Sequence, residues 1–177
     1  VPTIAFINKR AISAGALISL SCEKIYMTGG ATIGATTAVD MQGNKASEKV
    51  ISYMREEMAS TAEKRGRNKI IARGMVDEEL EFPSKIVNEF VNSDNEIDTI
   101  KTKIYYLMFD SDTVIVDDIE GRKQGNLITL TTEQSLKYNI ADASIDNFDA
   151  VLDSLGFSTL SVKKTKEKWS ESFVRFL

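Results

Sequence analysis

The sequence contains no histidine among its 177 residues. This absence excludes Ser-His-Asp and Cys-His catalysis within the chain, because both need an imidazole base. It also excludes a zinc site built on imidazole ligands. If a serine of this chain acts as a nucleophile, its base must be a lysine or a carboxylate. Lysine is the usual partner in the known variant of the triad.

Other scarce features narrow the class of protein further. The only cysteine, Cys22, rules out an internal disulfide, and its apolar neighbours predict a buried small side chain. No apolar run reaches the length that spans a membrane, and no signal peptide is visible. The sequence also lacks a P-loop, a G-x-G-x-x-G fingerprint and internal repeats. We therefore expect neither a cofactor nor a metal.

The composition is that of an ordinary globular protein, with 42% hydrophobic and 27% charged residues. The length suffices for one domain with a real core. A net charge of -4 and the lack of a basic cluster with interleaved aromatics argue against nucleic-acid binding. The chain begins inside a strand-like run, Val1–Ile7, so we expect a fragment whose upstream part is missing.

A serine stands at a predicted strand-to-helix corner, Ala11-Ile12-Ser13-Ala14-Gly15. Such a corner can present a nucleophile at the N-terminal end of a helix, where backbone N–H groups favour developing negative charge. Ala14 and Gly15 leave room for a substrate backbone to approach. In the alternative interpretation, Ser13 only caps the helix, which is the usual role of serine at this place.

The remaining pattern alternates strands and helices, which indicates an α/β layer fold. Strands are expected at 25–27, 31–35, 127–130 and 160–162, and a hairpin at 104–109 and 113–116. Helices are expected at 13–22, 47–64 with Ser47 as N-cap, 70–75, 133–138 with an αL stop at Asn139, and 149–155. The polar segment 84–125 reads as an insertion, and 161–177 as a linker with an amphipathic end at 169–177.

Several segments, in order, resemble the NfeD-type membrane-associated serine proteases of the ClpP/signal-peptide-peptidase-A class. They are Val1–Ala5, Arg10–Ile18, Ile25–Met27, Gly30–Ala35, Ser47–Tyr53, Ala62–Asn68, Met75–Asp77 and Leu130–Gln134. The resemblance covers about residues 1–83 and 126–160. It implies a ClpP/crotonase-like α/β fold, here lacking its N-terminal part and carrying a β-containing insertion. Residues 1–160 would form the protease domain.

The resemblance also implies a Ser-Lys dyad. The serine of the Ser-Ala-Gly motif corresponds to Ser13, and the lysine maps onto Lys49, with Lys45 as the second choice. A lysine base must be neutral near pH 7, although a model lysine titrates near ~10.4. One oxyanion donor is the Ala14 N–H, next to Gly15, and the other comes from a glycine-rich loop upstream of Val1. Thr32, Ile33 and Gly34 would flank the bound peptide.

The expected activity is that of a serine endopeptidase that cleaves hydrophobic segments of membrane-associated, stomatin- or flotillin-like proteins. Two alternatives remain: a crotonase-type enzyme acting on acyl-CoA, and a catalytically silent scaffold for membrane partners. By the resemblance, the full-length protein is membrane-associated and a homo-oligomer, with its protease domain outside the cytoplasm.

Overall fold

The computed structural model describes residues 2–39, 42–80, 84–91, 99–107, 113–115, 125–157 and 162–163. The strands are β1 (Ile4–Ile7), β2 (Arg10–Ile12), β3 (Lys24–Met27), β4 (Thr32–Gly34), β5 (Ser84–Val91), β6 (Thr99–Leu107), β7 (Thr113–Ile115), β8 (Thr129–Thr131) and β9 (Ala143–Ser144). The helices are α1 (Ala14–Ser21), α2 (Glu48–Lys64), α3 (Lys69–Gly74), α4 (Thr132–Lys137) and α5 (Phe148–Ser154).

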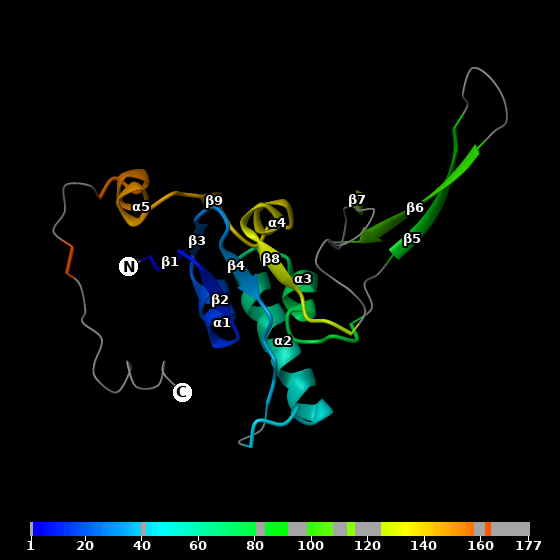
Figure 1. Cartoon of the computed structure of the whole chain (residues 1–177), viewed down its shortest axis with the longest axis horizontal. Helices are drawn as coiled ribbons and strands as arrows, with labels where there is room; N and C mark the ends of the chain where they lie inside the picture. Colours follow the sequence, from blue (N-terminus) through cyan, green and yellow to red (C-terminus); the bar gives the residue numbers. More distant parts are fainter. Residues whose placement is uncertain are drawn as a thin grey trace.

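Two small sheets with helices against them form the body of the molecule, so the predicted α/β class is confirmed (Figure 1). One sheet has the order β1-β3-β9, and all its strands are parallel. The other has the order β2-β4-β8, in which β2 and β4 are parallel and β8 is antiparallel. The connection through α1 links both parallel pairs, as a crossover helix does in α/β folds.

The core lies between these sheets and the helices α1, α2 and α3. It consists mainly of aliphatic residues and methionines that are almost completely buried, such as Leu20, Ile25, Met27, Ile33, Met58, Ile71, Met75, Ile128 and Leu130. On α2 the buried residues are Ile51, Met58, Ala59 and Ala62. With the partly buried Met54, the positions 51, 54, 58 and 62 have the three-to-four spacing that predicted the helix.

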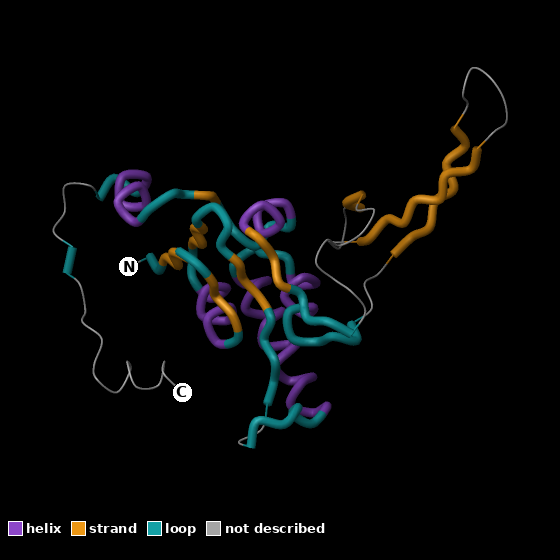
Figure 2. Tube along the Cα trace, in the orientation of Figure 1, coloured by secondary structure: helices purple, strands orange, loops and turns teal. Residues whose placement is uncertain are grey.

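A third sheet, with the order β5-β6-β7, is formed entirely within the predicted insertion. Figure 2 shows that the β5–β6 ribbon extends away from the body. The predicted hairpin is confirmed, since β6 and β7 pair antiparallel. The sequence interpretation missed β5, and it missed β2 and β9 in the body, because all three contain polar residues that break the apolar runs used to find strands.

Most predicted helix ends are confirmed. Thr131 forms a capping box with Gln134 at the start of α4, and Asn139 adopts φ 55° after its end. Ser47 is the N-cap residue of α2, as predicted, although its side chain makes no capping hydrogen bond. Cys22 is half-buried, not buried, because it lies where α1 ends at the surface.

Two expectations lie largely beyond the described residues. Of the predicted strand 160–162, only Val162 is described, and it is not in a strand. The amphipathic segment 169–177 lies outside the described residues. None of the helices in the described part of the chain is long and apolar enough to cross a membrane.

Gly34 is the glycine on which the second sheet depends. Its φ is 138°, and a Cβ added there would lie 2.2 Å from the Ile128 carbonyl oxygen. Any other residue would both strain the backbone and push the segment before β8 away from β4. Ile128 itself is completely buried, so this segment has little room to move.

We predict that Gly34→Ala destabilises the domain by more than about 3 kcal/mol, because its Cβ meets backbone in a packed region. The matched control is Gly29→Ala, since nothing lies within 4 Å of a Cβ at that position. It should change the unfolding free energy by less than about 0.5 kcal/mol. Urea unfolding followed by circular dichroism measures both, and equal effects would contradict the role assigned to Gly34.

Candidate active site

Ser13 lies in a strained corner between β2 and α1. Its backbone angles are φ 55° and ψ -126°, and an ordinary N-cap residue has extended angles instead. Such a conformation costs a non-glycine residue of order 1–3 kcal/mol and persists only where the surroundings enforce it. Here the Ser13 N–H donates to two carbonyl oxygens, of Gly34 and Ala35, each at 3.2 Å. The end of β4 therefore holds the corner.

A second strained residue supports the first. Ala35 has φ 39°, and its N–H donates to the Ile128 carbonyl oxygen at 2.9 Å. The Thr36 hydroxyl donates to the Ser13 carbonyl oxygen at 3.4 Å. The segment Gly34-Ala35, which accepts the Ser13 N–H, is thus held at its opposite edge by the Ile128 carbonyl oxygen.

The side chain of Ser13 points into solvent-accessible space. It is exposed and makes no capping bond to α1, so the capping alternative raised by the sequence is wrong. Ala14 and Gly15 are the first two residues of α1, so their N–H groups lack the acceptors that the helix interior supplies. These donors stand beside the hydroxyl, at the positive end of the helix dipole.

Lys49 lies in the first turn of α2 and is exposed. It is two residues before the buried Ile51, which places it on the opposite side of the helix. There it lines a shallow groove with other residues of α2, namely Ser52, Tyr53, Glu56, Glu57 and Ser60. Among the described residues no hydrogen bond joins Lys49 to Ser13. The helix α1, which begins directly after Ser13, packs against α2, which contains Lys49.

Lys45, the second choice for the base, is already engaged. It lies in the connection between β4 and α2, where its backbone forms an isolated antiparallel β-bridge with Val39. Its ammonium donates to the Glu78 carboxylate. This hydrogen bond raises the pKa of Lys45 above its ordinary value. Lys45 therefore holds its proton in this arrangement, which is unfavourable for a base.

The three residues of β4, next to the Ser13 corner, lie mostly in the interior of the domain. Thr32 is half-buried, Ile33 is completely buried and Gly34 is buried. Both edges of β4 are paired, one with β2 and the other with β8. A peptide at the site therefore cannot extend this sheet at β4. Within the described residues, no group of three acidic or cysteine side chains comes together to hold a metal.

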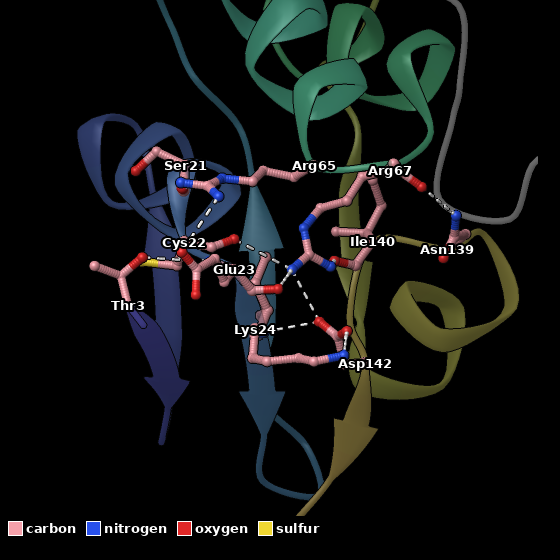
Figure 3. Close-up of polar contacts among 12 residues, drawn as sticks. Thr3, Ser21, Cys22, Glu23, Lys24, Arg65, Arg67, Asn139, Ile140 and Asp142 are labelled. Atoms are coloured by element: carbon pink, nitrogen blue, oxygen red, sulfur yellow. Dashed lines mark hydrogen bonds and ion pairs between the residues drawn. The ribbon is translucent and has the colours of Figure 1, made fainter. Parts of the chain in front are cut away.

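The sequence interpretation missed an ionic cluster centred on Arg67 and Asp142 (Figure 3). Arg67 is 7% exposed, and its guanidinium lies 2.9 Å from the Asp142 carboxylate, which also contacts the Lys24 ammonium at 2.9 Å. The Ile25 N–H donates to the same carboxylate, and Arg67 donates to the Ile140 carbonyl oxygen at 2.8 Å. The cluster joins the end of α2 to β3 and β9. In the sequence, its one local signal is Arg67, which directly follows Gly66, the glycine that ends the α2 segment.

The family of the chain follows from comparison with known proteins. The model of the NfeD1b N-terminal domain matches residues 1–103. The chain belongs to this family. The resemblance predicted from the sequence is thereby confirmed.

One curated relative matches the whole chain. Membrane protein NfeD1b of Bacillus subtilis (strain 168) is 29% identical over 177 residues. These residues are 100% of this chain but only 32% of that protein, so the chain spans about a third of its relative's length.

Solved structures of a membrane protease share the fold. A lysine-to-alanine mutant of the 1510-N membrane-bound stomatin-specific protease, in complex with a substrate peptide, superposes with a TM-score of 0.63 at 18% identity. The match covers 99% of this chain and 69% of that one. The 1510-N protease specific for a stomatin homologue from Pyrococcus horikoshii gives a TM-score of 0.54 at 17% identity, over 99% and 67% of the two chains.

The strained, uncapped serine gives a stability prediction. Ser13→Ala should change the unfolding free energy by less than about 0.5 kcal/mol, because no capping bond is lost. Thr131→Ala, at a real capping box, should cost about 1 kcal/mol. Ser13→Gly should be at least as stable as the wild type, because glycine tolerates the positive φ. Chemical denaturation measures all three, and a loss with Ser13→Ala as large as with Thr131→Ala would contradict the uncapped corner.

The ionic cluster gives a pH prediction. Burial acts to raise the pKa of Asp142, but hydrogen bonds from Ile25, Lys24 and Arg67 outweigh it and leave the pKa below its ordinary 3.8. A lowered pKa stabilises the fold above the unfolded value, and this contribution disappears as the pH falls through the folded value. Asp142→Asn should therefore cost about 1–2 kcal/mol at pH 7 and progressively less below about pH 4.

The matched control for this series is Asp153→Asn, on the exposed side of α5. Its unfolding free energy should follow that of the wild type at every pH. A cost of Asp142→Asn that stays constant from pH 7 to pH 3 would show that its carboxylate charge contributes nothing.

Proposed function

We propose that this domain is a serine endopeptidase in which Ser13 is the nucleophile and Lys49 the general base. We also propose that its fold is of the ClpP/crotonase-like class, with residues 1–160 as the protease domain, 84–125 as an insertion and 161–177 as a linker. The observation that carries the proposal is the conformation of Ser13. Its backbone is strained, its side chain is exposed and makes no capping bond, and it lies beside the first N–H groups of α1. Strain of this kind gathers at sites where it serves a mechanism.

The proposed mechanism requires the Lys49 amine to reach the Ser13 hydroxyl. The neutral amine of Lys49 accepts the Ser13 hydroxyl proton while the oxygen attacks the peptide carbonyl carbon. The negative charge that develops on the carbonyl oxygen is stabilised by the Ala14 N–H at the start of α1. The intermediate collapses as the Lys49 ammonium returns the proton to the leaving amine. Water then attacks the acyl-enzyme with Lys49 again as base, which releases the acid and restores Ser13.

The exposed position of Lys49 adds a requirement. Exclusion of water favours the neutral form of an amine, so we propose that the outer face of α2 is covered during catalysis. The bound substrate and a second copy of the chain are the two candidates for this cover. We therefore propose that the full-length protein acts as a homo-oligomer, in which this groove is shielded from solvent.

The substrate class is supported by the relatives. The similar solved structures are of a membrane-bound protease specific for stomatin, and the curated relative is named a membrane protein. We propose that this domain cleaves hydrophobic segments of stomatin- or flotillin-like membrane proteins. The proposal places the full-length protein at a membrane, with the protease domain outside the cytoplasm.

A fluorophosphonate probe tests the nucleophile and its base in the full-length protein. We expect labelling of the wild type, and a loss of at least about 10³-fold in labelling rate with Ser13→Ala and with Lys49→Ala. Two matched controls should retain it. Ser47→Ala removes an exposed serine hydroxyl that makes no capping bond before α2. Lys64→Ala removes a lysine at the other end of α2.

The alternatives give other outcomes. Labelling that survives Ser13→Ala contradicts the nucleophile, and labelling lost with Lys45→Ala but not with Lys49→Ala moves the base to Lys45. Binding of a CoA thioester without labelling by the fluorophosphonate would support a crotonase-type enzyme. Absence of both labelling and CoA-thioester binding would support a catalytically silent scaffold.

A further inference from the structure

A pocket of about 200 Å³ opens between the segment that follows β4, the start of α2 and the segment that follows α3. It is lined by Thr37, which is two residues after Ala35, and by Leu127, which directly precedes Ile128. Ala35 and Ile128 are joined by the hydrogen bond that fixes the corner. Two segments of the pocket lining thus directly continue the chain from the two residues of this hydrogen bond.

The pocket combines an apolar floor with an acidic rim. Ala38, Ile51 and Val76 form the floor and are almost completely buried. The rim carries four carboxylates, from Glu48, Asp77, Glu78 and Glu79, and one ammonium, from Lys45. Such a lining suits a side chain with a long apolar stem and a cationic end.

The ion pairs at the rim leave an excess of negative charge. Arg55 pairs with Asp77, and Lys45 pairs with Glu78. The Glu48 carboxylate is 79% exposed, and the Arg55 guanidinium is 3.9 Å away. Glu79 adds to the field that favours the charged form of Lys45. The rim already holds one lysine ammonium, which comes from the chain's own connection between β4 and α2.

We infer that this pocket binds the side chain of a lysine or arginine of the substrate, within about two residues of the bond that is cleaved. The stem packs on Ile51 and Val76, and the cationic end takes the place of Lys45 at Glu78. This inference rests on the proposed function and narrows its substrate class. The preferred substrate is a hydrophobic segment with one basic residue beside the cleavage site.

Peptide binding to the full-length Ser13→Ala variant tests the pocket without catalysis. Fluorescent apolar peptides carry Lys, Arg, Leu or Glu at one position, and that position is moved along the series. We expect Lys and Arg at one position to bind about threefold to fivefold tighter than Leu, with Glu the weakest. The preference should shrink as salt is added. Equal binding of all four peptides at every position would overturn the inference.

Variants at the rim locate the effect. On the same background, Glu78→Gln should abolish the preference for Lys and Arg, and Lys45→Met should strengthen it, because the competing ammonium is gone. Glu133→Gln, on the exposed side of α4 and outside the pocket lining, should leave it unchanged. A preference that persists in Glu78→Gln, or disappears equally in Glu133→Gln, contradicts the pocket.

The two proposals fail separately. If the full-length protein cleaves peptides with no preference for a basic residue, the pocket inference is wrong and the endopeptidase stands. If Ser13 is not labelled by the probe but basic peptides still bind through Glu78, the endopeptidase is wrong and the pocket remains a peptide-binding site.

Discussion

The two hydrogen bonds from the Ser13 N–H to the carbonyl oxygens of Gly34 and Ala35 are the constraint on which the site depends. They end the pairing of β2 with β4 and turn the chain sharply into α1. Without them, a serine has no reason to hold φ 55°. The side chain is released from its usual capping role by the same turn, because its backbone no longer has the extended angles of a cap.

This constraint is transmitted by close packing and not by charge. Gly34 lets the Ile128 carbonyl approach β4, and Ile128 in turn accepts the Ala35 N–H. The charged groups lie elsewhere: Arg67 and Asp142 tie the end of α2 to β3 and β9, and Lys45 with Glu78 spans the pocket rim. The Ser13 corner is thus held by backbone hydrogen bonds and close packing, while the ion pairs lie at the cluster around Arg67 and at the pocket rim.

Much of the fold was predictable from the sequence. The spacing of Ile51, Met58 and Ala62 predicted α2, and Thr131 with Asn139 marked both ends of α4, because these signals are local. The strands β2 and β9 were missed because they are short and partly polar, and only pairing with distant strands makes them strands. The ionic cluster was missed for the same reason, since 75 positions separate Arg67 from Asp142.

The sequence by itself determined the chemistry that is available: no imidazole, a serine before two small residues, and lysines at the start of a long helix. Residue types and local spacing carry that information. Only the tertiary structure decided that Ser13 is strained and uncapped and that Lys45 is paired with Glu78. It also decided that Lys49 faces outward. These properties arise from contacts between segments far apart in the chain, and no local pattern encodes them.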